Sequence, residues 1–552
     1  SPFGFYPFPS TGIDGMRMGV GMSNSRDSSE IDVYTLRFDY TTQLDQYNNL
    51  KAGAEFILTD SRTNYGSVDI FLPSGRSNSK WNSTPTRGAL YVQNKLEFEG
   101  MIANLGVRMD YSHAGGDWFV YDEFTRAFAA EYSLGIDTLL EKAPTDRILN
   151  FSPRLGVAFP ITVSSKLYFN YGHFRSMPQP ENLYMIRRFS DNNAVTRIAN
   201  PNNPLPKTVA YELGYEQSLF DNYLLRVAGY YKSMSSQTNL VTFTSRDNKV
   251  NYSVSQPNSY GDIRGFEITL SKNRGDWVQG FLNYTYMVST SGFFGLGQYY
   301  ENPADQRNYE RVTLFNVQNR PIPAPYGRAN IDFFTPMEFG PEIGGIYLLE
   351  DIRLNLVGSW SSGFYFTWVG GGSQPGIQNN VQWKDYYNID MRIAKNFKFG
   401  KANFQFFVDV SNVMNQKHMY KYGLVNALDY EAYMKSLQLP DEIGNKIASY
   451  INIPGSDRPG EYRRGGTFTP MEAVGDIRNV AISQIRPTAI YWDKLSNGFY
   501  QYVNGAWAAV ETSRIDEIMK NKSYIDMPNQ DFFTFLNARQ VYFGIKFSFE
   551  LF

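Results

Sequence analysis

The stretch Ile263–Met287, IRGFEITLSKNRGDWVQGFLNYTYM, decides the fold. Two runs of about a dozen residues alternate in polarity on either side of a polar turn, Lys272–Asp276. A period of two indicates β-strands, because successive side chains of a strand point to opposite faces. Soluble sheets typically use strands of about five or six residues. The longer runs found here fit tilted strands that cross a lipid bilayer as part of a barrel.

The same alternating unit recurs along the chain, and the period-two template gives about fifteen strands. Short and long connections alternate between them, which is typical of transmembrane barrels with tight turns on one side and long loops on the other. We therefore expect an all-β, transmembrane antiparallel β-barrel with long extracellular loops. The expected strands include Val33–Gln43, Ala52–Leu58, Ser152–Pro160, Lys166–Phe174, Thr208–Leu219, Tyr223–Lys232, Arg328–Thr335, Ile352–Phe366, Asn388–Phe397, Asn403–Met414 and Gln540–Leu551, with a further turn at Glu99–Gly100.

The composition supports the same fold class. The 552 residues include 40 Tyr and 41 Phe, which predicts aromatic belts at the membrane interfaces. Mean hydropathy is −0.40 and no run of 18 apolar residues occurs, so the sequence contains no transmembrane helix. The alternative fold is a Tyr-rich soluble sandwich or propeller. Nothing in such a fold would place every long loop on one side of the sheet.

Charge and cysteine content exclude several functional classes. The net charge of −2 argues against a nucleic-acid partner. The absence of cysteine excludes a disulfide scaffold and a Cys-ligated metal site. The three histidines, His113, His173 and His418, lie far apart in sequence, and neither G-x-S-x-G nor H-E-x-x-H occurs. We therefore expect no enzyme activity, no cofactor and no metal site.

Charged residues at i, i+2 spacing form the clearest polar pattern within the strands. Two residues at this spacing lie on the same face of a strand. We predict that they face a polar lumen, where the simplest interpretation is that they pair with each other. These lumen-facing residues are Arg37 with Asp39, Arg108 with Asp110, and Asp390 with Arg392.

The longest connection precedes the final strand, and we expect residues 417–537 to form a large extracellular insertion. The patterns predict helices at Glu431–Leu437, Asp441–Tyr450 and Ser513–Lys520. A small hairpin is expected to turn at Asn504–Gly505. A loop of this length rarely lacks a function.

The candidate ligand-binding residues lie in this insertion: Arg458, Tyr462, Arg463 and Arg464. Guanidinium groups suit carboxylate, phosphate or anionic-chelate ligands, and aromatic rings stack on sugar or catechol rings. The alternative is an Arg-rich loop that contacts lipopolysaccharide or a neighbouring loop. Three tryptophans near the preceding strand, Trp360, Trp368 and Trp383, are interpreted as belt residues.

Several stretches resemble the barrel part of TonB-dependent outer-membrane receptors. The IRGFE…GDW…YTY hairpin resembles the family's I-x-G-x-E…G-W…Y-x-Y pattern, whereas Lys207 stands where the family usually has Glu. The terminal Phe552 resembles the signal for outer-membrane insertion, although it is one residue out of step with the apolar alternation. The remaining stretches are SPRLG at 152–156, NPN…LPK…YELG between 200 and 214, and DVSNVMN at 409–415.

The resemblance implies a barrel of about 22 strands filled by an N-terminal plug. About fifteen strands are found, so we expect residues 1–552 to form a partial barrel that lacks the plug and roughly seven strands. The implied function is energy-dependent uptake of a bulky nutrient, such as an iron chelate, oligosaccharide or peptide, in the outer membrane of a Gram-negative bacterium.

The implied partners are outer-membrane lipid and lipopolysaccharide, and a TonB-type protein that contacts the N-terminal part. A lipoprotein or another surface partner is a further candidate. Two rival functions remain open. One is a passive porin-like channel, and the other is a surface barrel that anchors a partner through residues 417–537.

Overall fold

The computed structural model forms two compact units. The first consists mainly of Arg17–Thr269 and Thr285–Pro323, and the second of Leu270–Tyr284 and Ala324–Phe552. The structure describes the following residues: 10–11, 17–18, 25–67, 77–177, 179–189, 192–313, 318–344, 346–368, 377–417, 434, 437–446, 452–461, 469–520 and 538–549.

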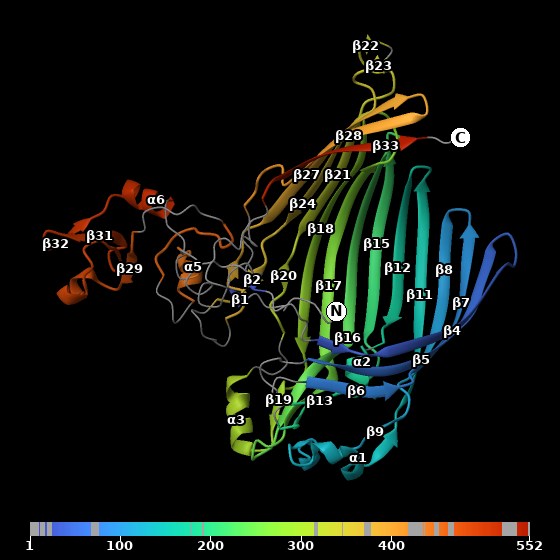
Figure 1. Cartoon of the computed structure of the whole chain (residues 1–552), viewed down its shortest axis with the longest axis horizontal. Helices are drawn as coiled ribbons and strands as arrows, with labels where there is room; N and C mark the ends of the chain where they lie inside the picture. The colour runs from blue at the N-terminus through green and yellow to red at the C-terminus, as the bar shows by residue number, and fades with distance from the viewer. Residues whose placement is uncertain are drawn as a thin grey trace. The chain divides into compact units, whose positions relative to one another are not determined.

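Antiparallel strands make up most of the first unit (Figure 1). Each strand pairs with the next in the order β4-β5-β7-β8-β11-β12-β15-β16. Two further long strands, β17 (Asn251–Lys272) and β18 (Val278–Phe293), have residues in both units. The bounds are β4 Glu30–Gln43, β5 Asn48–Ser67, β7 Thr86–Phe98, β8 Met101–His113, β11 Arg147–Thr162, β12 Ser165–Arg175, β15 Lys207–Leu219 and β16 Tyr223–Thr244.

The second unit contains five more long strands, which pair antiparallel in the order β21-β24-β27-β28-β33. Among the described residues, the chain therefore has fifteen strands of nine or more residues, the number that the sequence predicts. The predicted all-β class is confirmed. The bounds are β21 Tyr326–Phe334, β24 Ile352–Ser361, β27 Tyr386–Phe399, β28 Ala402–Ser411 and β33 Gln540–Phe549.

The alternation of polarity sets the two faces of the sheet in the first unit. In β4, Leu36 and Phe38 are 74% and 64% exposed, and they alternate with Arg37 and Asp39 on the opposite face. Apolar side chains can remain this exposed over a whole strand face when lipid rather than water surrounds them. No helix among the described residues is long and apolar enough to cross a membrane.

Several strands are longer than the sequence patterns predict. β16 continues to Thr244 rather than ending at Lys232, and β17 begins at Asn251 rather than Ile263. A tilted membrane crossing needs only about 9–11 residues, so these strands extend beyond it. The ends of both strands, around Val241 and Tyr252, pack against the longer connections of the first unit. A short strand, β6 (Ser77–Ser83), pairs with the similarly extended end of β5 and was not predicted.

The extended ends join the longer connections in a second core, which we call the loop layer. Its centre is apolar: Phe128, Val195, Ile198 and Val241 are each 0% exposed. In Figure 1 the elements of the loop layer lie at one end of the long strands of the first unit. The layer comprises β9 (Asp117–Phe119), η2 (Arg126–Phe128), η3 (Ser133–Gly135), α1 (Ile136–Leu139), β10 (Lys142–Pro144), β13 (Ile186–Arg188), β14 (Val195–Ile198), β19 (Gln298–Tyr300) and the adjoining ends of β16 and β17.

Two further helices lie in the long connections of the first unit. α2 (Pro180–Tyr184) supplies Leu183 and Tyr184 to a smaller apolar cluster with Trp81. α3 (Pro303–Val312) has Asn302 as its N-cap, and the Asn302 side chain accepts a hydrogen bond from the Ala304 backbone N–H. An Asn at this position stabilises the first turn, because that turn has no intrahelical partner for its N–H groups.

The insertion before β33 contains its own small sheet, of order β29-β30-β31-β32. The predicted hairpin is present and turns at Asn504 and Gly505, both with positive φ (49° and 85°), as a two-residue hairpin turn requires. The bounds are β29 Met471–Val474, β30 Ile490–Asp493, β31 Gly498–Val503 and β32 Ala506–Ala509.

The helices predicted for the insertion have mixed outcomes. The helix at Ser513–Lys520 is present as α6 (Thr512–Lys520). In the described part of Asp441–Tyr450, only α5 (Asp441–Gly444) is helical, and Gly444 lies against the Asn452 side chain. Most of Glu431–Leu437 lies outside the described residues, as does Phe552.

The prediction that three tryptophans form a membrane belt is wrong for two of them. Trp383 is 1% exposed and Trp368 is 5% exposed. Trp383 stacks on Phe364 with 5.5 Å between ring centroids and lies against Gly460 of the insertion. A buried indole cannot reach the headgroup region, so these tryptophans form the core of a connection between β24 and β27.

Candidate functional site

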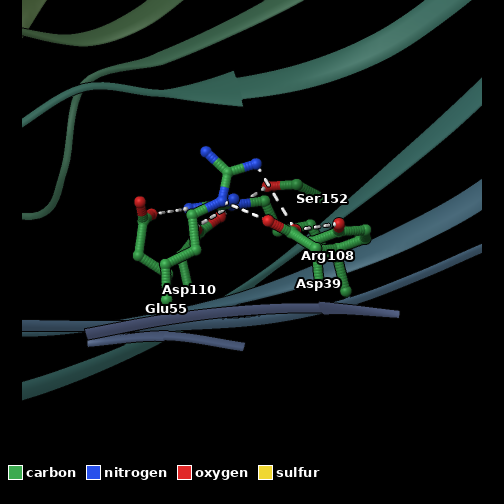
Figure 2. A network of polar contacts seen from close by, with 7 residues as sticks. Asp39, Glu55, Arg108, Asp110 and Ser152 are labelled. Carbon is green, nitrogen blue, oxygen red and sulfur yellow. Dashed lines mark hydrogen bonds and ion pairs between the residues drawn. The ribbon is translucent and has the colours of Figure 1, made fainter. Parts of the chain in front are cut away.

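A network of polar side chains crosses the face of the first unit that lies opposite the exposed apolar residues (Figure 2). Arg37 Nε lies 2.6 Å from Asp39 Oδ2. The Tyr91 hydroxyl donates a hydrogen bond of 2.5 Å to Asp39 Oδ1 from β7. Gly53 makes this contact possible, because a Cβ at that position would lie 2.4 Å from the Tyr91 ring. The tyrosine ring covers the glycine, as in other sheets where an aromatic residue packs over a strand glycine.

Arg108 is the centre of the second half of this network. Its Nε lies 2.6 Å from Asp110 Oδ1, and its Nη2 lies 3.4 Å from Glu55 Oε2 on β5. Ser152 on β11 donates to Asp110 Oδ2 at 3.4 Å. The three charged side chains are 20–31% exposed, which strengthens their interaction relative to fully solvated pairs. The two halves of the network thus involve five consecutive strands, β4 to β11.

We expect the Arg108→Met variant to lower the stability of the first unit by about 1–2 kcal/mol, because Glu55 and Asp110 lose the cation between them. The midpoint of urea unfolding of the purified protein measures this effect. Arg37→Met is the control, since the Arg37 side chain is 62% exposed and its pair with Asp39 is worth little in water. Equal midpoints for the two variants would contradict the special role of Arg108.

The third predicted pair has a different arrangement. Arg392 does not pair with Asp390 but lies 3.5 Å from Asp409 on the neighbouring strand β28, over the Phe407 ring at 4.3 Å. Asp390 accepts hydrogen bonds from Asn388 Nδ2 at 3.0 Å and from the Asn412 backbone N–H at 2.8 Å. The i, i+2 spacing predicts a shared face, but the register places a better partner across the strands: Arg392 lies directly opposite Asp409. That all six residues face a lumen stays a prediction.

A hollow of about 720 Å³ lies on the same face of the first unit. Its floor has no side chains at Gly106, Gly156 and Gly172, which come from three consecutive strands. Its rim carries Arg154, whose guanidinium lies 4.9 Å from the Phe174 ring centroid, and Lys232. Sequence reasoning missed this hollow. The available signal was a glycine on the same face of three neighbouring strands, but it becomes visible only once the register is known.

The aromatic core of the loop layer perturbs the Tyr121 hydroxyl. Burial, with a smaller contribution from the charge of Glu123, raises the pKa of Tyr121 to about 12. The ring lies edge-on to Phe128, with 5.0 Å between centroids. Burial also raises the pKa of Tyr184 in α2. These phenols therefore remain protonated at a pH where an exposed tyrosine ionises.

This raised pKa predicts that the loop layer is lost in alkali. An unfolded tyrosine ionises near pH 10, so the stabilising contribution of Tyr121 is complete below pH 10 and is lost between pH 10 and about 12. The contribution amounts to roughly 3 kcal/mol. Tyrosinate absorbance should rise cooperatively above pH 10, and Tyr121→Phe should shift that rise to higher pH. A gradual, unshifted titration would contradict the prediction.

The predicted ligand-binding residues of the insertion remain mostly untested. Arg458 is exposed and precedes the segment that contacts Trp383. Tyr462, Arg463 and Arg464 lie outside the described residues. Their role in ligand binding therefore stays a prediction.

Two histidines have local roles in the first unit. His113 Nε2 lies 3.2 Å from Thr145 Oγ1, and His173 Nε2 lies 2.7 Å from the Tyr171 hydroxyl. His418 lies outside the described residues. Within the part of the chain that the structure describes, no group of three or more His, Asp or Glu residues could hold a metal ion.

The family model of the TonB-dependent receptor-like β-barrel matches residues 3–413 of the chain. The chain belongs to the TonB-dependent receptor β-barrel family. Proteins of this family are β-barrels of the bacterial outer membrane and act as receptors and transporters rather than enzymes. The family predicted from the sequence motifs is thus confirmed, and the alternating polarity and long strands described above fit it.

Solved TonB-dependent receptors are similar to this chain at low identity. The FrpB iron transporter from Neisseria meningitidis is 13% identical with a TM-score of 0.42, over 70% of this chain and 51% of that protein. The transporter YddB from Escherichia coli is 12% identical with a TM-score of 0.47, over 75% and 54% of the two chains. The ferric yersiniabactin receptor FyuA from Yersinia pestis is 12% identical with a TM-score of 0.43, over 71% and 50%.

The chain thus spans about half the length of the solved receptors that it matches. The comparison with curated proteins returned no match.

Proposed function

We propose that this chain is the larger part of the barrel of a receptor that imports a bulky nutrient across the outer membrane of a Gram-negative bacterium. The family match carries the proposal. The polar face of the first unit and its hollow of about 720 Å³ support it, because such a surface suits a lumen through which a polar solute passes. Iron chelates, oligosaccharides and peptides are the candidate nutrients, and no covalent chemistry is required of the chain.

The proposal includes a partial barrel. The described residues contain fifteen strands of nine or more residues, whereas the family resemblance implies about 22. We propose that further strands, and a plug that contacts a TonB-type energy-coupling protein, complete the transporter.

Uptake in intact cells tests the transport function. Cells that express the protein should accumulate one of the candidate nutrients, and an uncoupler of the inner-membrane proton gradient should abolish accumulation. The intact mass and N-terminal sequence of the protein from outer membranes should show a plug on the same polypeptide. Uptake that persists without the gradient would support the passive channel instead and would refute the energised importer.

A second candidate function rests on the insertion, which we propose to be extracellular and to comprise residues 417–537. It contains its own four-stranded sheet and α6, more structure than a simple connecting loop needs. This favours a docking site for a lipoprotein or another surface protein. Deletion of residues 417–537 separates the two functions. If the importer binds its ligand through this segment, uptake is lost, whereas retained uptake with loss of a co-purifying partner supports anchoring.

A further inference from the structure

A small cavity of about 130 Å³ lies in the first unit, where the polar face meets the segment that follows β12. Three arginines line it, Arg87 from β7, Arg108 from β8 and Arg175 from the end of β12, together with the carboxylates of Glu55 and Asp110. The cavity is therefore a place where guanidinium groups outnumber carboxylates. Met177 and Leu205 form its apolar side.

The positive charges of this cavity are not balanced within it. Arg108 forms ion pairs with both carboxylates: its Nε lies 2.6 Å from Asp110 Oδ1 and its Nη2 lies 3.4 Å from Glu55 Oε2. Arg175 donates from Nη1 to the Leu205 carbonyl at 3.2 Å, but its buried Nε has no hydrogen-bond partner. Arg87 lines the cavity as an exposed residue and has no ion pair among the described residues. A buried guanidinium N–H without an acceptor is costly, so the arrangement suits an incoming anion.

The cavity also contains a hydroxyl group whose hydrogen-bond acceptor is weak. Ser112 is 4% exposed, and its Oγ contacts only the sulfur of Met177, at 3.4 Å. A thioether sulfur is a weak acceptor, and a stronger acceptor in the cavity would replace it. Ser112 and Arg175 come from different strands, β8 and β12, and both provide a donor to the same small space.

We propose that this cavity binds one oxyanion group, a carboxylate or a phosphate, of a small diffusible solute. Arg87 and Arg175 supply the charge, the fork of Arg175 supplies paired donors, and Ser112 donates a further hydrogen bond. At about 30 Å³ per water molecule, the volume equals that of about four waters, so it accommodates the anionic group and not a whole nutrient. The inference rests on the proposed function, which it deepens by assigning the transported ligand an anionic group.

Equilibrium dialysis of the full chain in detergent, with radiolabelled phosphate and with citrate as probes, tests the inference. Wild-type protein should bind phosphate saturably, and citrate should compete. Arg175→Gln should weaken binding by about tenfold or more, and the double variant Arg87→Gln/Arg175→Gln should abolish it. Arg175→Lys keeps the positive charge but lacks the paired N–H donors of a guanidinium. It should therefore weaken phosphate binding, but less than Arg175→Gln does.

Arg226→Gln is the matched control. Arg226 lies on β16 of the same unit, outside the cavity, and its guanidinium pairs with Glu216 at 2.8 Å. This variant should bind phosphate like the wild type. Retention of the β-sheet circular dichroism spectrum in every variant shows that a loss of binding is not a loss of folding. Absence of saturable binding in the wild type, or equal binding in the double variant, would overturn the proposal.

A protein carboxylate is the other group that could fill the cavity. In that case phosphate does not bind, and Arg175→Gln lowers the urea midpoint of the protein extracted from membranes, which also overturns the proposal. The test is independent of the transport function. If the protein binds phosphate but shows no energised uptake, the anion site is supported and the importer is refuted. If the protein shows energised uptake that the double variant does not change, and binds no phosphate, only the anion site is refuted.

Discussion

The Phe128→Ala variant is expected to unfold the loop layer while the long strands stay paired. Phe128 is fully buried, and its ring lies 4.7 Å from that of Tyr252 and 5.0 Å from that of Tyr121. Removal of a buried phenyl group costs about 3–5 kcal/mol, because the remaining cavity collapses only partly. The loop layer has one small apolar core, so this loss of stability should unfold all of its segments together.

Limited proteolysis with identification of the cut sites measures this effect. The variant should be cut within residues 117–144 at protease concentrations that leave the wild type intact, and the strands should stay protected. Leu134→Ala is the control, because Leu134 lies in the same segment but is 72% exposed. If Phe128→Ala and Leu134→Ala were cut at equal rates, the loop layer would not behave as one packed unit.

The Gly280→Ala variant should prevent or severely weaken formation of the sheet in the second unit. Gly280 in β18 has a φ of 138°, which residues with a Cβ rarely adopt. A Cβ at this position would also lie 2.0 Å from the Asn330 carbonyl oxygen of β21. Backbone strain and a clash with a fixed carbonyl add to roughly 4 kcal/mol.

The yield of folded protein in the outer membrane and its thermal unfolding temperature measure this effect. Gly358→Ala provides a matched control in β24 of the same unit, because the nearest atom to its added Cβ is Ala329 Cβ at 3.5 Å, an ordinary contact. Gly358→Ala should fold with wild-type yield. If the Gly280→Ala protein had the yield and unfolding temperature of the wild type, β18 and β21 would be able to move apart with little loss of stability.

The number and order of the long strands could be predicted from the sequence because each one carries its own period-two pattern. The hairpin at Ile263–Met287 is clear without any knowledge of its neighbours. Strand ends were less predictable, because β16 and β17 continue into the loop layer, where their residues pack against segments distant in sequence. Trp368 and Trp383 were misinterpreted for a similar reason. Their burial depends on contacts with residues distant in sequence.

The candidate site was predicted only in part, because pairing across strands depends on register. The link from Arg108 to Asp110 follows from local spacing, but the link from Arg108 to Glu55 joins residues 53 positions apart. The cavity lined by Arg87 and Arg175 required four strands and the segment after β12 to be placed first. A single sequence carries no signal for such a convergence, since each arginine alone resembles any other polar strand residue.

The loop layer also affects how the immune system would encounter this protein. Its surface is assembled from residues before Leu140, around Ile198 and around Val250, which are far apart in sequence and are held together by one core. We expect the long connections to be extracellular, so this surface should face the outside of the cell as a discontinuous epitope. Antisera raised against synthetic peptides from a single segment should recognise the denatured chain on a blot and fail on intact cells. Only an immunogen that preserves the whole assembly should elicit antibodies that label living bacteria.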